Sequence, residues 1–346
     1  MKALVKTKKD VGLEYQDIPV PRPGRKDVLV KVKASAICGS DIKIYEWVPW
    51  CENVVKSLPI IPGHECAGEV VEVGEEVKEI KVGDKVAAET HVPCGVCWQC
   101  RHNRPHTCEK MQLFGHTING CFAEYSLIPE VSTRKIPDSI SFDEGCLLEP
   151  MGIPFRAVEE GEVKGEAVVV IGCGPIGQFA ISFSKIMGAE KIIGIDVNEK
   201  RLNIARKMGA THLINPETDS VVRKVKDLTK DYGGGAGVVI EASGNTAALK
   251  DAFGYIRIGG KIFMIGHLQN PLTIDTSPNI VLKEVQIKGL FGRKIWSTWD
   301  KTEKLLTSGK MNLSPVITHR FPLSGFEKAF EVALSGEGCK VLLIPD

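Results

Sequence analysis

Four cysteines fall within fifteen residues of the chain and follow the spacing C-x2-C-x2-C-x7-C. Two-residue gaps let a tight turn direct successive sulfurs toward one point, and zinc needs that convergence because Zn–S bonds are about 2.3 Å long. Four thiolates leave no open coordination position, so the spacing predicts a structural zinc ion. An iron–sulfur cluster and four unrelated buried thiols are the alternatives. The cysteines are Cys94, Cys97, Cys100 and Cys108.

A glycine-rich turn follows the apolar run VVVIG. It carries Gly172, Gly174 and Gly177 in the spacing G-x-G-x-x-G, with Pro175 and Ile176 between the last two glycines. Between a strand and a helix, this pattern predicts a dinucleotide site: the first glycine makes the turn, the second admits the pyrophosphate, and the third packs helix on strand. The phosphates would lie at the helix N-terminus. The alternative is an ordinary strand-to-helix turn.

An acid follows the next apolar run, where a dinucleotide site would hold the adenosine ribose. Asp196 comes nineteen residues after Gly177. A carboxylate there accepts hydrogen bonds from the ribose hydroxyls and repels the 2′-phosphate of NADP, which favours NAD. Arg201 lies close by in the sequence and would suit that phosphate, so NADP is the alternative.

Three further segments offer metal ligands: Cys38 in ICGSD, His64 and Glu65 in PGHE, and Glu149 in LLEP. Three or four such ligands with one open position would make a catalytic zinc site. Each residue also has a plainer interpretation, because Cys38 could be a small buried hydrophobe, His64 a turn residue and Glu149 a helix N-terminal acid. Spacing alone leaves this choice open.

The pattern of apolar and turn-forming residues changes along the chain, and with it the kind of element expected to position the candidate residues. Residues 1–150 contain short β-like runs broken by glycine and proline, which predicts an antiparallel, barrel-like domain. In residues 151–293, apolar strands alternate with helix-length segments, which predicts a parallel sheet covered by helices on both faces. Short pieces return in residues 294–346 and end in the strand-like KVLLIPD, so this segment is expected to rejoin the first domain.

Composition narrows the class of protein. The chain has 346 residues, 43% of them apolar and 25% charged, which is typical of soluble globular proteins of about two domains. A net charge of +1 gives no strong attraction to nucleic acid or anionic membranes. The N-terminus lacks a signal-like apolar stretch, and no run approaches the roughly 20 apolar residues of a membrane span. Eleven cysteines without a signal peptide argue against disulfides, so we expect a cytoplasmic protein.

Taken together, the motifs resemble the zinc-containing medium-chain dehydrogenase/reductase superfamily over essentially the whole chain. ICGSD, GHE, the four-cysteine loop, GCFAEY, LLEP and GCGPIG occur in the superfamily's order. The resemblance implies an α/β fold, with a Rossmann doubly wound parallel sheet and a GroES-like β-barrel catalytic domain. It also implies two zinc ions per chain and NAD, with the catalytic zinc on Cys38, His64 and one or both of Glu65 and Glu149.

Within the superfamily, the chain most resembles the L-threonine 3-dehydrogenases. The likeness rests on IYEW at 44–47, ETHVPCG at 89–95, KGLFGRKIWSTW at 288–299 and SPVITHRF at 314–321. It implies a homotetramer that oxidises the secondary hydroxyl of L-threonine to give 2-amino-3-ketobutyrate. It also implies that His91 takes part in substrate choice, although His91 could equally be a packed loop residue.

Two departures from that family bear on the substrate. The family's proton relay reads C-G-T-D-x-H, whereas this chain reads CGSDIK, so Ser40 keeps the hydroxyl but Lys43 stands where histidine is usual. Gly152-Ile153 replaces the usual Gly-Asn. Ser40 is expected to pass the substrate's proton outward. Lys43 could accept that proton, contact an anionic group of cofactor or substrate, or simply face solvent.

Other functions remain as alternatives. Several polyol and polyol-phosphate dehydrogenases of the superfamily also lack the relay histidine, so a sorbitol- or galactitol-type dehydrogenase is the second hypothesis. A zinc-stabilised nucleotide sensor without catalysis is the third, and the intact set of Cys38, His64 and Glu65 argues against it. For an amino-acid substrate, Arg293 beside Trp296 and Trp299 could meet the carboxylate, but packing at a subunit interface is the favoured interpretation of the tryptophans.

Overall fold

The computed structural model describes all 346 residues. Contacts between residues divide the chain into two compact units. Unit 1 consists of Met1–Pro150, Lys294–Gly309 and Ile317–Asp346, and unit 2 of Met151–Arg293 and Lys310–Val316. Lys310–Val316 therefore groups with unit 2, whereas its place in the sequence predicts membership of the first domain. No helix combines the length and apolar character that a membrane span requires.

Unit 1 is built on a seven-stranded sheet in the order β16-β17-β3-β4-β5-β9, with β8 also paired to β3. Every pairing is antiparallel except that of β16 with β17. Two further pairs, β1 with β2 and β6 with β7, form separate two-stranded sheets. The strands of unit 1 are β1 (Lys2–Val5), β2 (Glu14–Asp17), β3 (Asp27–Ala36), β4 (Glu65–Val73), β5 (Lys85–Ala88), β6 (His91–Val92), β7 (Gln112–Leu113), β8 (Tyr125–Pro129), β9 (Thr133–Lys135), β16 (Ile317–Pro322) and β17 (Lys340–Ile344). Its helices are α1 (Gly39–Glu46), α2 (Cys51–Val54), α3 (Trp98–Arg101), α4 (Phe142–Gly145), α10 (Ser297–Thr307) and α11 (Phe326–Leu334), and α5 (Leu148–Gly161) begins in this unit. Its short 3-10 turns are η1 (Pro105–Thr107), η2 (Glu130–Ser132) and η5 (Leu323–Gly325).

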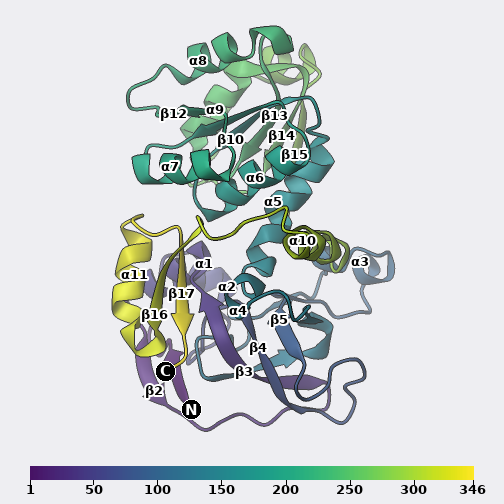
Figure 1. The fold of residues 1–346 in the computed structure, drawn as a ribbon, viewed down its shortest axis with the longest axis vertical. Coiled ribbons are helices and arrows are strands. Elements are labelled where there is room, and N and C mark those ends of the chain that lie inside the picture. The colour runs from purple at the N-terminus through teal and green to yellow at the C-terminus, as the bar shows by residue number, and fades with distance from the viewer. The chain divides into compact units, whose positions relative to one another are not determined.

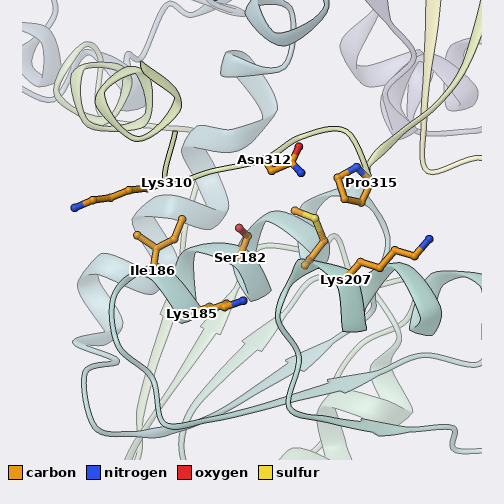
Figure 2. Close-up of a pocket in the computed structure, with 8 residues that line it drawn as sticks. Ser182, Lys185, Ile186, Lys207, Lys310, Asn312 and Pro315 are labelled. Atoms are coloured by element: carbon orange, nitrogen blue, oxygen red, sulfur yellow. The ribbon is translucent and has the colours of Figure 1, made fainter. Parts of the chain in front are cut away.

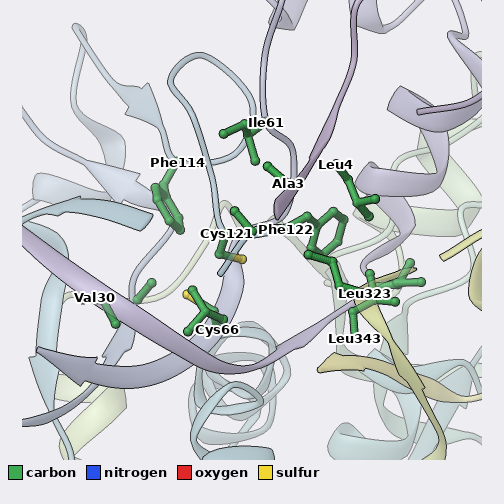
Figure 3. Close-up of a cluster of buried hydrophobic side chains, with 14 of the residues drawn as sticks. Ala3, Leu4, Val30, Ile61, Cys66, Phe114, Cys121, Phe122, Leu323 and Leu343 are labelled. Atoms are coloured by element: carbon green, nitrogen blue, oxygen red, sulfur yellow. The ribbon is translucent and has the colours of Figure 1, made fainter. Parts of the chain in front are cut away.

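The core of unit 1 joins the two ends of the chain. Figure 3 shows Leu4, Phe122 and Leu343, which come from β1, the segment before β8, and β17, within one cluster of buried apolar side chains. Backbone pairing adds to this contact, because Leu342 of β17 lies opposite Ala36 of β3. Burial of these apolar side chains is what holds the C-terminal strands against the N-terminal sheet.

Unit 2 contains six parallel strands in the order β12-β11-β10-β13-β14-β15 (Figure 1). The order runs outward in both directions from β10, which is the doubly wound topology, so the predicted fold class is confirmed. The strands are β10 (Ala167–Ile171), β11 (Lys191–Ile195), β12 (His212–Ile214), β13 (Ala236–Glu241), β14 (Ile256–Met264) and β15 (Gln286–Gly289). The helices are α6 (Pro175–Ile186), α7 (Glu199–Met208), α8 (Val221–Leu228) and α9 (Thr246–Tyr255), with short turns η3 (Lys230–Tyr232) and η4 (Ser277–Val281).

Helices bury the central strand β10 completely, since all five of its residues are inaccessible to solvent. Val169 and Ile171 share a buried cluster with Val225 of α8 and Phe253 of α9. Val170 points the other way, toward α6. Such a strand reads as a continuous apolar run because both of its faces are covered. Its carboxyl end leads directly into the glycine-rich turn.

Candidate active site

The four cysteines of the predicted structural zinc site converge in unit 1. Their sulfur atoms all lie within 4.8 Å of one another. The Cys97 Sγ lies 3.5 Å from the Cys100 Sγ and 3.8 Å from the Cys108 Sγ, close to the ~3.8 Å edge of a tetrahedron with Zn–S bonds of about 2.3 Å. The backbone N–H groups of Cys94 and Lys110 point at the Cys108 sulfur, each 3.3 Å away.

The local fold explains this convergence. Gly95 has a φ of 73°, which turns the chain after the first cysteine. Cys97 caps α3, which carries Cys100, and η1 returns the chain to Cys108. Backbone N–H groups, that of Cys100 first, lower the pKa of the Cys97 thiol to about 6. These donors favour the Cys97 thiolate, the form that binds a metal, whereas burial raises the pKa of the Cys100 thiol to about 12 and also raises that of Cys108.

Cys38 and His64 lie twenty-six residues apart in sequence but meet because β3 and β4 pair. Ala36, the last residue of β3, lies opposite Glu65, the first residue of β4. Cys38 follows β3 at the N-cap of α1, and His64 precedes β4 directly. The ligand atoms of Cys38, His64 and Glu65 lie within 4.8 Å of one another.

The surroundings of His64 attract positive charge. Burial lowers the pKa of His64, but the charges of Asp41 and Cys38 outweigh burial and raise it well above its ordinary value. Asp41 Oδ1 lies 3.5 Å from His64 Nδ1. The same carboxylate accepts hydrogen bonds from the Cys38 N–H at 2.8 Å and the Gly63 N–H at 3.2 Å. Asp41 thereby links both candidate ligands, and a carboxylate behind a ligating histidine orients the ring.

Glu65 makes a buried ion pair with Lys340 from β17. Lys340 Nζ lies 2.6 Å from Oε1 and 2.5 Å from Oε2 of Glu65, and the two side chains are 2% and 0% exposed. Burial lowers the pKa of Lys340, but the Glu65 carboxylate outweighs burial and the pKa is raised. Lys340 thus contacts both oxygens of Glu65 beside the Cys38–His64 pair.

Glu149 lies outside the group formed by Cys38, His64 and Glu65. It is buried in the first turn of α5, and the Thr90 hydroxyl donates a hydrogen bond to its Oε1. Its charge nonetheless acts on Glu65, whose pKa is raised by burial and further by Glu149. The structure therefore places Glu149 near the predicted metal site but not among the three grouped ligands.

The remaining predicted residues of this site come from α1 and β6. Ser40 lies in the first turn of α1, and Lys43 lies one turn later with its Nζ 5.3 Å from the centre of the Trp50 ring. His91 is buried, and its Nδ1 lies 2.8 Å from Oε1 of Glu89. Glu89 also accepts a hydrogen bond from the Trp299 indole N–H at 2.8 Å.

Packing at a subunit interface is wrong for Trp299, which is 0% exposed and lies inside unit 1. Trp296 packs edge-on against it and is only half-buried, so interface packing of Trp296 stays a prediction. Arg293 is buried in unit 2, with its side chain against the Cα of Gly152. Sequence patterns did not identify four residues that contact the predicted site residues, namely Asp41, Glu89, Thr90 and Lys340. Only Asp41 had a local signal, as an acid at the third position of a helix.

The glycine-rich turn of unit 2 fits a dinucleotide. Gly172 has a φ of 88°, which makes the turn after β10. A Cβ on Gly177 would lie 1.8 Å from the Gly172 carbonyl oxygen, so α6 approaches the turn as only glycine allows. A Cβ on Gly174 would meet no atom within 4 Å, which leaves open space at the N-cap of α6. Pro175 and Ile176 form the first turn of that helix, whose N-terminus attracts phosphate.

Asp196 directly follows β11, beside the glycine-rich turn. Its Oδ2 accepts a hydrogen bond from the Cys173 N–H at 2.7 Å, and its Oδ1 accepts one from the Asn198 N–H at 2.8 Å. Arg201 Nη1 lies 4.0 Å from the same carboxylate. The structure thus brings the acid, the arginine and the turn together.

Unit 2 also contains a pocket of about 370 Å³ beside α6 and α7. Figure 2 shows Lys207 and Lys310 extending in opposite directions from it, so their ammonium groups do not converge on one ligand position. None of the predicted site residues is among its lining residues, which are Ser182, Lys185, Ile186, Lys207, Met208, Lys310, Asn312 and Pro315.

Comparison with known proteins agrees with both units. The alcohol dehydrogenase GroES-like domain model matches residues 24–138, and the zinc-binding dehydrogenase model matches residues 175–308. The L-threonine 3-dehydrogenase of Bacillus licheniformis is 41% identical over 345 residues, covering 100% of this chain and 99% of that protein. The chain belongs to the zinc-containing medium-chain alcohol dehydrogenases. This confirms the predicted family, and with it an oxidoreductase that uses zinc and a nicotinamide cofactor.

Further relatives of this family match along their whole length. The L-threonine 3-dehydrogenase of Thermococcus kodakarensis is 38% identical over 346 residues, covering 100% of this chain and 98% of that protein. The structure of galactitol-1-phosphate dehydrogenase from Escherichia coli matches with a TM-score of 0.90 at 26% identity, covering 100% of both chains. The GroES-like and Rossmann architecture is therefore that of medium-chain alcohol dehydrogenases.

Proposed function

We propose that this dehydrogenase oxidises the secondary hydroxyl of L-threonine to 2-amino-3-ketobutyrate, with NAD as the hydride acceptor. The grouping of Cys38, His64 and Glu65 carries this proposal, because it offers a three-ligand metal site in a chain that matches L-threonine 3-dehydrogenases over its full length. The balanced reaction takes L-threonine and NAD⁺ to the ketone, NADH and one proton.

Two zinc ions per chain are part of the proposal. Four thiolates would hold one ion, and Cys38, His64 and Glu65 or Glu149 would hold the other with a position left for substrate. Bound zinc would polarise the substrate hydroxyl and bound NAD would accept the hydride. Asp41 supports the second site by orienting His64, and Lys340 balances the charge of Glu65.

The chain's own polar groups would handle the proton and the substrate. Ser40 Oγ would take the proton from the substrate hydroxyl and pass it outward. Lys43 lies three residues further on the same helix face, and its ammonium over the Trp50 ring is favoured by cation–π attraction. We assign the ammonium of Lys43 to an anionic group of substrate or cofactor. His91, held by Glu89, would contribute to substrate choice.

The preference for NAD rests on Asp196. Asp196 is only 8% exposed, and two backbone N–H groups hold its carboxylate beside the glycine-rich turn. A fixed negative charge there would repel the 2′-phosphate of NADP. Arg201 is close enough to offset part of this repulsion, so the preference is expected to be finite.

A substrate panel tests the proposal. NADH formation is measured with L-threonine, sorbitol, xylitol, galactitol and galactitol 1-phosphate, and zinc is counted in the same preparation. Turnover of L-threonine with two zinc ions per chain is expected. Turnover of a polyol without turnover of L-threonine would reject the threonine assignment and support the second hypothesis, which Lys43 and the likeness to galactitol-1-phosphate dehydrogenase favour. Zinc near one per chain, without turnover, would support a non-catalytic protein.

We further propose a homotetramer in a reducing compartment such as the cytoplasm. Strand β15 is the outer strand of its sheet, and all four of its residues are exposed. Exposed Ile287 lies on this edge, and Ile258 lies on the neighbouring strand β14. An unpaired edge with apolar neighbours is suited to pairing with a second copy, which would supply one interface of a tetramer.

The proposal of a reducing compartment rests on the cysteines. All eleven cysteines are free thiols, and the metal-binding ones must stay reduced.

A further inference from the structure

His116 lies in the loop between β7 and β8, in a segment that the functional assignment above does not use. Its N–H donates to the Leu113 carbonyl at 3.0 Å. Gly115 has a φ of 79°, and its N–H donates to the Ile118 carbonyl at 3.0 Å, which closes the loop. The loop is therefore a compact turn with a defined conformation.

Backbone contacts fix this loop against the chain that leads into His64. The Gly120 N–H donates to the Ile61 carbonyl at 2.7 Å, and the Cys121 N–H donates to the Gly63 carbonyl at 2.9 Å. A Cβ on Gly120 would lie 1.9 Å from the Gly63 oxygen, so the two backbones touch without intervening side chains. The position of the loop relative to His64 is thus set by direct backbone contact.

The imidazole of His116 consequently lies beside that of His64. The two ring centres are 4.6 Å apart, with 40° between the ring planes, and Trp50 packs edge-on against His116 at 5.8 Å. His116 is only 5% exposed, and the Phe114 backbone approaches its ring without giving either nitrogen a hydrogen bond of normal geometry. Two unsatisfied buried nitrogens are costly, so such a group in a native protein calls for a partner.

A metal ion is the less suitable partner. His116 does form a possible ligand group with Asp41 and His64. However, the Asp41 carboxylate already accepts from the Cys38 and Gly63 backbone N–H groups, and its Oδ1 lies 3.5 Å from His64 Nδ1. Asp41 is therefore engaged in positioning the two candidate zinc ligands. Of Asp41, His64 and His116, only His116 has no role assigned so far.

We propose that His116 is a specificity-determining residue that hydrogen-bonds the polar substituent next to the reacting carbinol of the substrate. This inference rests on the proposed function, for which the substituent is the amino group of L-threonine. The His116 ring lies 4.6 Å from the His64 ring, so this assignment has the group on the adjacent carbon of the substrate lie between the proposed metal and His116. An imidazole can accept from an amine or donate to a hydroxyl.

Two variants separate this role from packing. His116→Phe keeps an aromatic ring in the loop and removes both nitrogens, and His116→Asn restores one polar group near the position of Nδ1. L-Threonine is compared with 3-hydroxybutyrate, which keeps the secondary hydroxyl and the carboxylate but lacks the amino group. Measured quantities are kcat/KM for L-threonine, the inhibition constant of 3-hydroxybutyrate, the calorimetric Kd of L-threonine for the enzyme–NADH complex, and zinc content.

His116→Phe is expected to lower kcat/KM for L-threonine and to weaken its calorimetric binding by about 10- to 100-fold, the effect of losing a hydrogen bond to a charged group. The inhibition constant of 3-hydroxybutyrate should stay within about twofold, zinc content should not change, and His116→Asn should recover part of the loss. Equal losses for both ligands, a fall in zinc content, or no loss for L-threonine would overturn the proposal.

Failure of the proposed function gives a different result. In that case the parent enzyme itself turns over no L-threonine but oxidises a polyol. The same variants are then compared on 2,3-butanediol and 2-butanol, which differ only in the vicinal hydroxyl. A loss confined to the diol would support the role of His116, and equal losses on both alcohols would overturn it.

Discussion

The buried pair of Lys340 and Glu65 gives the most direct test of how the candidate metal site is held. Lys340→Met keeps the length and the apolar stem of the side chain and removes the ammonium group. The Glu65 carboxylate, 0% exposed, would then lose the contacts of 2.6 and 2.5 Å that balance its charge. The Ile37 carbonyl would lose a hydrogen bond from the same ammonium at 3.3 Å.

The expected cost is about 3–5 kcal/mol, because removing one partner of a buried ion pair leaves an uncompensated buried charge. This is a large fraction of the roughly 5–15 kcal/mol that stabilises a typical domain. Lys328→Met is the matched control, since Lys328 pairs with Glu331 at 2.9 Å but the two side chains are 61% and 67% exposed. Exposed pairs contribute about 0–1 kcal/mol, so the control should unfold much like the parent.

Urea unfolding of the zinc-loaded protein is the assay, followed by tryptophan fluorescence. All five tryptophans of the chain belong to unit 1, so the signal reports on the unit that holds the pair even when unit 2 unfolds separately. Zinc content of each variant, measured before denaturation, shows whether the loss of stability also weakens the metal site.

The double variant Lys340→Met with Glu65→Gln completes the cycle. Replacing both charges removes the uncompensated carboxylate, so the double variant should be more stable than Lys340→Met alone. A loss below about 1 kcal/mol for Lys340→Met, or a double variant less stable than the single one, would refute the view that Lys340 balances a buried charge.

Three further predictions concern the metal and nucleotide sites. Cys38→Ser should abolish activity and lower the zinc content from about two to about one ion per chain. Cys97→Ser should instead lower the urea midpoint of unit 1. Loss of both zinc ions in Cys38→Ser would contradict two separate sites. Gly177→Ala should destabilise unit 2 by about 1–3 kcal/mol and weaken NAD binding, because its Cβ would lie 1.8 Å from the Gly172 oxygen. Gly174→Ala is the control: open space surrounds that Cβ, so this variant should keep its stability and lose only NAD affinity. If Gly174→Ala and Gly177→Ala proved equally stable, the packing role of Gly177 would be disproved. Asp196→Asn should raise the NADP/NAD ratio of kcat/KM roughly tenfold, about 1.4 kcal/mol, and an unchanged ratio in steady-state kinetics would show that Asp196 does not select the cofactor.

Local patterns were sufficient for much of the architecture. The alternation of apolar runs and helix-length segments predicted the doubly wound sheet, because buried parallel strands read as continuous apolar runs and amphipathic helices leave a helical period in the sequence. The family and its fold followed from motifs in a set order. The place of Lys310–Val316 did not follow, because this short segment carries no period of its own and its packing depends on tertiary contacts.

Candidate site residues divide in the same way. The four cysteines converge within one loop, where spacing alone limits the geometry. Glu149 illustrates the limit of motifs, since an acid in a recognisable segment lies outside the group of Cys38, His64 and Glu65. Its hydrogen bond to Thr90 depends on how the chain before α5 packs against the segment after β5.

The sequence by itself determined which chemistry this chain carries: a four-thiolate metal loop and a nucleotide turn, each written in residues a few positions apart, and a second set of metal ligands spread over three segments. Tertiary structure alone decided what surrounds them. Lys340 reaches Glu65 across 275 residues, and Trp299 reaches Glu89 across 210. His116 meets His64 because glycine backbones touch. Such contacts leave no local period or spacing, because they are selected by burial and charge balance in the folded chain.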